Sequence, residues 1–351
     1  MGTDAVRPTG RGSPLTLPPR RAVRARYDEE DVRVRPGPRS HPRTKDRPHH
    51  DQAQTGSVVA VDRGRYTCRV DGSTVLAMKA RELGRSGVVV GDQVALVGDV
   101  SGSAGTLARI VRVEARRSVL RRTADDLDPV ERVMIANADQ LVIVTSLARP
   151  EPNTRLVDRA LVAAYDAGMD PLLCLTKADL APPDDLLTAY AGLDVPWVVT
   201  RSDEDPGQLR RALHDRTSVL LGPSGVGKST LVNTVVPGAS RVTGRVNTLT
   251  GQGRHTSSSV IALALTDGGW IIDTPGIRSF GLGHVDPRHL LEAFDDLAAG
   301  TVGCPRGCRH DRDAAARGCA LPAWVAAGHA TVARLESWYR LLDAITTAGE
   351  G

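Results

Sequence analysis

The sequence predicts a multidomain fold with three folded parts: an N-terminal β-barrel of the OB type, an α/β domain with a phosphate-binding loop, and a small C-terminal α-helical domain. Three observations support this prediction. Short alternating strands fill residues 56–116, apolar strands alternate with helical stretches in residues 117–284, and a Cys/His cluster lies in the helical segment 285–351. With 351 residues the chain is also too long for one ordinary core.

The N-terminal segment, residues 1–55, is predicted to be a disordered basic tail. Residues 1–50 hold eleven Arg and one Lys against six acidic residues, although the whole chain carries a formal net charge of only +4. Pro is frequent and apolar residues are few, which disfavours a packed core. The tail is either a solvated extension or an arm that touches RNA, and the sequence leaves both open.

The barrel is expected in residues 56–116, where apolar and polar positions alternate and Gly, Asp or Ser break the pattern. Five strands in about 60 residues fit an OB-fold. Barrels of this type often bind RNA, but a barrel that serves only as a spacer would show the same periodicity.

The α/β domain is expected from about residue 135, where strands such as QLVIVTSL and PLLCLTK alternate with helices predicted at 154–168, 183–192 and 206–214. This alternation indicates a parallel sheet covered by helices on both faces. Two further strands, SSVIALAL and GGWIIDT, lie beside a loop rich in Gly, Ser and Thr.

The strongest local signal is GPSGVGKST, which follows the apolar strand SVLLG and opens a helix. It matches GxxxxGK[ST], in which backbone N–H groups cradle phosphates, Lys228 reaches the β and γ phosphates, and Ser229 offers its hydroxyl to Mg²⁺. The candidate nucleotide-binding residues here are Gly222, Pro223, Ser224, Gly225, Val226, Gly227, Lys228, Ser229 and Thr230.

Two further segments complete a phosphate site. DTPG ends the strand GGWIID, where Asp273 is expected to be linked to Mg²⁺ and Gly276 to sense the γ-phosphate. Between the two motifs, GRHTSSS contains Thr256, which is predicted to close a switch loop over Mg²⁺, although a Thr in a loop need have no such role.

The base-recognition candidate is TKAD, which contains Thr176, Lys177 and Asp179 and ends the strand PLLCLTK. The Asp179 carboxylate can accept hydrogen bonds from N1–H and N2–H₂ of guanine, while the Lys177 stem packs over the base. A helix-capping Asp would give the same letters, and the usual consensus begins with Asn rather than Thr. The loop expected to contact the base near residue 200 reads VVTRSDED and supplies no candidate.

The guanine motif precedes the phosphate loop in this chain, whereas it follows the phosphate loop in an ordinary GTPase. Joining the old chain ends and cutting a surface loop elsewhere preserves the sheet. The motif order therefore predicts a circularly permuted GTPase domain.

A zinc site is predicted at Cys304, Cys308, His310 and Cys319, spaced C-x3-C-x-H-x8-C. Thiolates and imidazole in a reducing compartment favour tetrahedral zinc over disulfides, and four protein ligands indicate a structural metal. Free thiols are the alternative, and His329 is the reserve ligand. Cys68 and Cys174 lie in strand patterns and are expected in the core.

The last helix is predicted over residues 331–345. Val332, Leu335, Leu342 and Ile345 are expected to cover the zinc core. Trp338 and Tyr339 either do the same or stack on RNA.

With these motifs in view, the sequence resembles the ribosome small-subunit-dependent GTPases, the RsgA or YjeQ family, over residues 56–345. The resemblance implies an OB-fold, a permuted GTPase domain and a zinc domain that act late in maturation of the small (30S) subunit, with rRNA as partner and ribosome-stimulated hydrolysis of GTP to GDP. His255 matches the position of the family's catalytic role, although a solvent-facing loop His remains an alternative. The resemblance rests on GRYTCRV, VVGDQV, IANADQLVIV, TKADL, GPSGVGKSTLVN, GRHTSSS, DTPG and the Cys/His cluster.

Other functions remain open from the sequence alone. Ile277 follows DTPG where Ras-like enzymes place a water-orienting Gln, so intrinsic hydrolysis is expected to be slow. The rivals are a P-loop ATPase and a nucleotide-gated RNA-binding module with negligible turnover. We expect a cytoplasmic protein, because no apolar stretch is long enough for a membrane span and the N-terminus is rich in Arg and Pro where a signal peptide would be apolar. A monomer is the default expectation.

Overall fold

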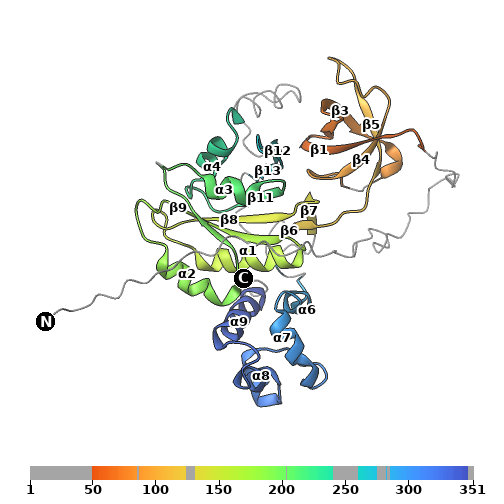
Figure 1. The fold of residues 1–351 in the computed structure, drawn as a ribbon. Coiled ribbons are helices and arrows are strands. Elements are labelled where there is room, and N and C mark those ends of the chain that lie inside the picture. The colour runs from red at the N-terminus through yellow and green to blue at the C-terminus, as the bar shows by residue number, and fades with distance from the viewer. Residues whose placement is uncertain are drawn as a thin grey trace.

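A closed five-stranded barrel begins the computed structural model, which describes residues 50–84, 87–123, 131–202, 204–239, 260–274, 282 and 285–346 (Figure 1). The basic tail lies almost wholly outside these ranges. Four residues singled out in the sequence also lie outside the described residues: His255, Thr256, Gly276 and Ile277.

The barrel closes because β1 pairs with both β2 and β4, β3 pairs with β5, and β5 returns to β4. Side chains at alternate positions point inward, and Cys68, Val75 and Ile110 are fully buried. The predicted OB-type barrel is therefore confirmed. Its strands are β1 (Gln54–Asp62), β2 (Arg65–Val70), β3 (Ser73–Lys79), β4 (Gln93–Val97) and β5 (Ala108–Val113), with a short 3-10 helix at Arg81–Leu83.

A separate two-stranded sheet links the barrel to the α/β domain. It consists of β6 (Val119–Thr123) and β7 (Glu131–Ala136), which pair antiparallel. This hairpin has no clear sequence signal, because charged residues such as Arg121, Arg122 and Arg132 interrupt its apolar alternation.

The α/β domain is built on strands in the order β10-β9-β8-β11-β13-β12. The first five are parallel to their neighbours, as predicted, and β12 runs antiparallel to β13. Their bounds are β8 (Gln140–Ser146), β9 (Asp170–Thr176), β10 (Trp197–Val199), β11 (Thr217–Leu221), β12 (Ile261–Ala264) and β13 (Trp270–Asp273).

Helices cover both faces of this sheet (Figure 1). The Asn153 side chain caps α1 by accepting a hydrogen bond from the Leu156 N–H, and the helix buries an apolar stripe against the sheet. One face carries α1 (Thr154–Asp166), α2 (Asp184–Tyr190) and the 3-10 turn η3 (Ala191–Leu193), and the other carries α3 (Gly207–Leu213) and α4 (Lys228–Val235).

The barrel and the α/β domain share one continuous 11-stranded sheet. β1 pairs antiparallel with β12, with Ala60 opposite Ile261. The sequence predicted two separate sheets, because periodicity shows which residues form a strand but not which strand lies beside it.

The C-terminal part is helical and packs against α1 (Figure 1). In its last helix, Leu335, Trp338, Tyr339 and Leu342 are buried, as expected of a covering face. Val332 is 68% exposed, so its predicted burial is wrong, and the burial of Trp338 and Tyr339 excludes the RNA-stacking alternative for them. The elements are α6 (Pro287–Leu291), α7 (Asp295–Gly300), α8 (Leu321–Ala326) and α9 (Val332–Thr346), with 3-10 turns at Thr301–Gly303 and Arg312–Arg317.

None of the helices within the described ranges is long and apolar enough to cross a bilayer.

Candidate nucleotide site and metal centre

Three strands of the parallel sheet end in candidate nucleotide motifs at one edge. β9 ends at Thr176, β11 ends directly before the glycine-rich loop, and β13 ends at Asp273. β8 lies between β9 and β11, and β13 lies on the other side of β11. Ligands of α/β folds bind at the carboxyl ends of parallel strands, so the sheet brings the phosphate and base motifs together regardless of their order in the chain.

The glycine-rich loop is shaped by its glycines. A Cβ on Gly222 would lie 2.3 Å from the Val144 carbonyl oxygen, and Gly225 and Gly227 have φ of +83° and +99°. Only glycine accepts this geometry without strain. α4 begins at Lys228, so its first N–H groups face the loop. Val226 anchors the loop in the core, Pro223 is half-buried, and Ser224, Ser229 and Thr230 are exposed.

Lys228 and Asp273 form the charged centre of this edge. The Lys228 ammonium donates to the carbonyl oxygens of Gly222 and Pro223, the latter at 2.7 Å. Burial lowers the pKa of Lys228, and the nearby Asp273 carboxylate opposes this shift. Burial raises the pKa of Asp273, and Lys228 opposes that shift in turn. Each group therefore stabilises the charge of the other at a site where phosphates and a cation would add further charges.

The base motif is fastened to the phosphate loop by two side chains. The Thr176 hydroxyl donates to the Val226 carbonyl oxygen at 2.6 Å. The Lys177 ammonium donates to the Gly225 carbonyl oxygen at 2.8 Å and also to the carbonyl of Arg149. The departure of Thr176 from the Asn consensus therefore still leaves a side chain that bonds the loop backbone.

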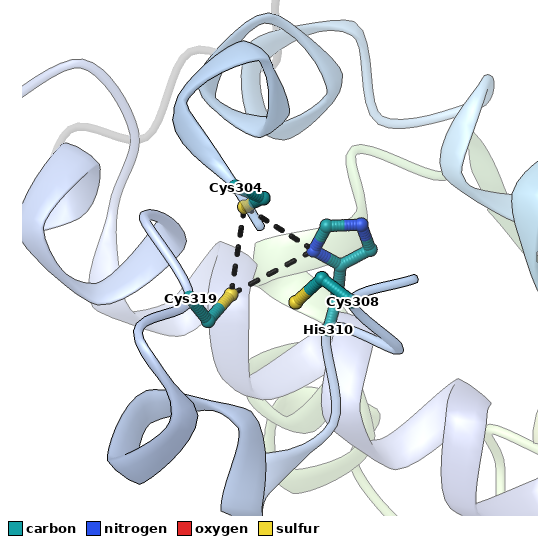
Figure 2. Close-up of side chains that lie close together, drawn as sticks. All are labelled: Cys304, Cys308, His310 and Cys319. Carbon is teal, nitrogen blue, oxygen red and sulfur yellow. Dashed lines mark hydrogen bonds between the residues drawn. The ribbon is translucent and has the colours of Figure 1, made fainter. Parts of the chain in front are cut away.

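The Cys/His cluster forms a second candidate site (Figure 2). Cys304 Sγ lies 3.6 Å from His310 Nδ1 and 3.8 Å from Cys319 Sγ, and Cys319 Sγ lies 3.6 Å from His310 Nδ1. Cys308 completes a group whose four ligand atoms all lie within 4.8 Å of one another. Tetrahedral zinc with bonds of about 2.3 Å to sulfur and 2.0 Å to nitrogen needs edges of about 3.8 and 3.6 Å. The cluster could therefore hold a metal ion of this type.

The surroundings of the cluster suit a metal. The Ala320 N–H donates to Cys304 Sγ at 3.3 Å, and Trp338 Nε1–H donates to the His310 carbonyl oxygen at 2.7 Å, which ties the cluster to α9. Burial lowers the pKa of His310 and so favours the neutral imidazole that binds metals. His329 lies outside the cluster and stacks on Trp324, with ring centroids 4.0 Å apart.

Comparison with known proteins gives the family. Residues 113–283 match the family model described as RsgA GTPase. The small ribosomal subunit biogenesis GTPase RsgA 1 of Vibrio vulnificus (strain YJ016) is 34% identical over 273 residues, 75% of each chain. This chain belongs to the RsgA GTPase family. Its RsgA relative from Pseudomonas aeruginosa (strain LESB58) is 38% identical over 73% of this chain and 75% of that one, and the one from Chlorobaculum parvum (strain DSM 263 / NCIMB 8327) is 35% identical over 83% and 96%.

Solved structures agree with this RsgA membership. YjeQ from Thermotoga maritima superposes with a TM-score of 0.62 at 25% identity, covering 84% of this chain and 98% of that one. YloQ, described as a circularly permuted GTPase, gives a TM-score of 0.60 at 22% identity, covering 86% and 98%, which speaks to the fold alone. The permuted order inferred from the motifs is thereby confirmed.

Two contacts of the candidate nucleotide site were not predicted from the sequence. The Arg149 carbonyl, in the loop after β8, accepts from Lys177. Ser202, in the loop that supplied no candidate, has its hydroxyl 3.2 Å from Asp179 Oδ1. A backbone carbonyl has no sequence signal. The position of Ser202, two residues beyond Thr200, hid it from a search for a Ser at the strand end.

Proposed function

We propose that this RsgA-family protein hydrolyses GTP to GDP and phosphate during late assembly of the small (30S) ribosomal subunit, and that binding to the subunit and its rRNA stimulates the reaction. The observation that carries the proposal is the convergence of the phosphate, cation and guanine motifs on one sheet edge. The curated relatives bear the name small ribosomal subunit biogenesis GTPase, which supports the partner.

The roles within the site follow from the chemistry of its residues. Residues 222–230 hold the phosphates, with Lys228 against the β and γ groups, and Thr176, Lys177 and Asp179 hold the guanine base. Ser229 and Thr256 would hold Mg²⁺, Asp273 would support the ion, and Gly276 would sense the γ-phosphate. A bound Mg²⁺ would supply positive charge that offsets the charge of the phosphates. In the proposed reaction water attacks the γ-phosphorus, and the bond from that phosphorus to the bridging oxygen of GDP breaks.

Catalysis is assigned to His255 and Thr256 on the family's pattern. Thr256 would close a switch loop over Mg²⁺, and His255 would assist hydrolysis because Ile277 stands where Ras-like enzymes place a Gln. A His255→Ala protein that keeps full subunit-stimulated activity would remove this assignment.

The C-terminal cluster is proposed to hold one structural Zn²⁺. Four protein ligands leave no open position for substrate, so the ion stabilises the helical domain and takes no part in hydrolysis. We assign residues 1–55 to the tail, 56–116 to the barrel, 117–284 to the GTPase domain and 285–351 to the zinc domain of a cytoplasmic monomer without membrane attachment.

The deciding experiment measures phosphate release from GTP and from ATP, each with and without purified small subunits. Lys228→Ala is the blank, and Thr188→Ala, an exposed change on α2, is the control substitution. We expect strong stimulation by subunits with GTP alone. Equal rates with and without subunits would overturn the proposed partner, and bound GTP without turnover would favour a nucleotide-gated RNA-binding module instead.

A further inference from the structure

The loop that follows β8 lies against the phosphate loop. β8 ends at Ser146, and α1 begins at Thr154. Between them, the Arg149 carbonyl oxygen accepts a hydrogen bond from the Lys177 ammonium, which also donates to the Gly225 carbonyl oxygen of the phosphate loop at 2.8 Å. One ammonium therefore bridges the two loops, so the two carbonyl oxygens lie within about 6 Å of each other.

Further contacts hold the loop after β8 in this position. The buried Ser146 hydroxyl donates to the Pro150 carbonyl oxygen at 2.6 Å. Pro150 Cδ lies 3.8 Å from the position that a Cβ on Gly225 would take. Arg149 has φ of +51°, a left-handed conformation that is uncommon for a residue with a side chain and persists only where the surroundings fix it. The backbone therefore places Arg149 at the contact with the phosphate loop.

The Arg149 side chain has no role in holding the fold together. It is exposed, and within the described residues its guanidinium has no hydrogen bond or ion pair. Glu151, two residues further along the chain, is also exposed and forms no ion pair with it. Because the stem of Arg is long and flexible, the guanidinium can reach a ligand that is seated on the neighbouring loop.

Arg149 also lies beside two other cations. Lys177 and Lys228 both donate to carbonyl oxygens of the phosphate loop, and Asp273 is the carboxylate whose charge acts on Lys228. A site lined by one sign of charge concentrates ions of the opposite sign, and a bound polyanion relieves the repulsion between its cations. The fork of a guanidinium also matches two oxygens of one phosphate, which an ammonium does not.

We propose that Arg149 binds the phosphates of the bound nucleotide, as a third cation beside Lys177 and Lys228. The inference rests on the proposed nucleotide site and adds to it a residue of the loop after β8. That loop belongs to none of the motifs that define the site, so the assignment depends on the geometry and the charge of the folded chain.

The test is a series of charges at one position, read out as the affinity of the full chain for fluorescent GDP and a non-hydrolysable GTP analogue without ribosomes. Arg149→Gln removes the charge and should weaken both about three- to tenfold, the effect of one charge-assisted contact. Arg149→Lys should lose less and Arg149→Glu more. The losses should shrink as salt is added. Arg155→Gln is the matched control, because Arg155 is an exposed arginine at the start of α1 and should bind as the wild type does.

Thermal unfolding separates binding from a role in folding. Without nucleotide, Arg149→Gln should unfold at the wild-type temperature or slightly above it, because repulsion among the cations is reduced. With GDP it should unfold below the wild type, because a weaker ligand stabilises less. Lower stability without nucleotide, equal affinities across the charge series, or an equal loss in Arg155→Gln would each overturn the inference.

Two further outcomes have separate meanings. Unchanged nucleotide affinity together with weaker binding to the small subunit would make Arg149 a contact to RNA, which also overturns the inference. A wild-type protein that prefers ADP would overturn the proposed function alone. ADP carries the same two phosphates as GDP, so its affinity should then follow the same series of charges at Arg149.

Discussion

The GTPase domain has two neighbours, and it is joined to them in different ways. On the barrel side the contacts are made to backbone carbonyls: the Ala136 N–H donates to the Val90 carbonyl at 3.0 Å, and the Asn137 side-chain amide donates through Nδ2 to the Gly91 carbonyl at 2.9 Å. The shared strand pairing of β1 and β12 continues this backbone junction.

On the zinc-domain side the junction is made by side chains: α9 and Phe294 pack against α1 in one apolar cluster, and two arginines add polar contacts. Arg340 forms an ion pair with Asp158 at 3.1 Å, donates to the Ala189 carbonyl at 2.8 Å and lies over the Tyr190 ring. Arg334 donates to Asp296 and to the Gly192 carbonyl, at 3.1 and 3.3 Å. A junction at backbone atoms leaves no room for an added side-chain atom. A junction between side chains loses stability step by step as its charged groups are removed.

Loss of the metal is expected to have the largest effect on the junction between the zinc domain and the GTPase domain. We expect Cys319→Ser, or treatment with a strong chelator, to unfold the zinc domain and release α9 from α1, because metal binding in small domains contributes on the order of 10 kcal/mol to folding. Metal content and thermal unfolding measure the effect. His329→Ala, outside the cluster, should keep one zinc per chain. Loss of zinc without loss of α9 docking would show that the arginines and the apolar packing on α1 hold the junction without the metal.

The barrel junction can be broken with one methyl group. In Gly91→Ala the Cβ would lie 1.9 Å from the Ala136 carbonyl oxygen, at φ +92°. We expect a loss of about 3 kcal/mol in the free energy of unfolding. Gly72→Ala is the matched control, because Gly72 has φ +82° with nothing within 4 Å and should lose only about 1 kcal/mol. Similar losses in both variants, measured by denaturant unfolding, would mean that Gly91 matters only for its backbone angle.

A smaller effect is expected from Arg340→Ala, which leaves the buried Asp158 carboxylate without its counter-charge. We expect about 2 kcal/mol of destabilisation at neutral pH. Burial raises the pKa of Asp158 in the folded state, with Arg340 opposing, so removing Arg340 raises that pKa further. A raised folded pKa favours folding at low pH, so the deficit should shrink as the pH falls from 7 towards about 4. A deficit that stays constant with pH would mean lost packing rather than lost charge.

The smallest effect concerns Asp286, which caps α6 at the start of the zinc domain by accepting from the Arg288 N–H. Hydrogen bonds from Arg288 lower the pKa of Asp286 to about 2. A lowered folded pKa gives stability above about pH 4 that is lost as the pH falls towards 2. Asp286→Asn should retain much of the cap and flatten this dependence, while Asp286→Ala should cost up to about 1 kcal/mol. Unfolding measured between pH 2 and 5 distinguishes these outcomes.

The sequence predicted the elements of this molecule better than their contacts. Glycine spacing and Lys228 defined the phosphate loop, because its chemistry needs those residues at those positions. The four metal ligands were likewise predictable from spacing, and the structure brings them together. The junctions were not predictable: Gly91 acts through its backbone carbonyl, which any sequence has, and the Asn137 side chain finds it only in the folded chain. Arg340 likewise meets Asp158 only after helices far apart in the chain have packed. The predicted burial of Val332 was wrong for a similar reason. Helical periodicity defines which residues share a face of the helix, but not how far along the helix the neighbouring elements cover that face.

Strand β12 has a consequence for shortened versions of the protein. One of its sides is paired with β13, and at Ile261 the other meets β1 of the barrel. Removing the barrel would leave that side as an open sheet edge, with unpaired N–H and C=O groups between apolar side chains. Such edges recruit strands from other molecules, so a barrel-free GTPase domain should self-associate as its concentration rises. In the full chain the barrel covers the start of this edge at Ile261.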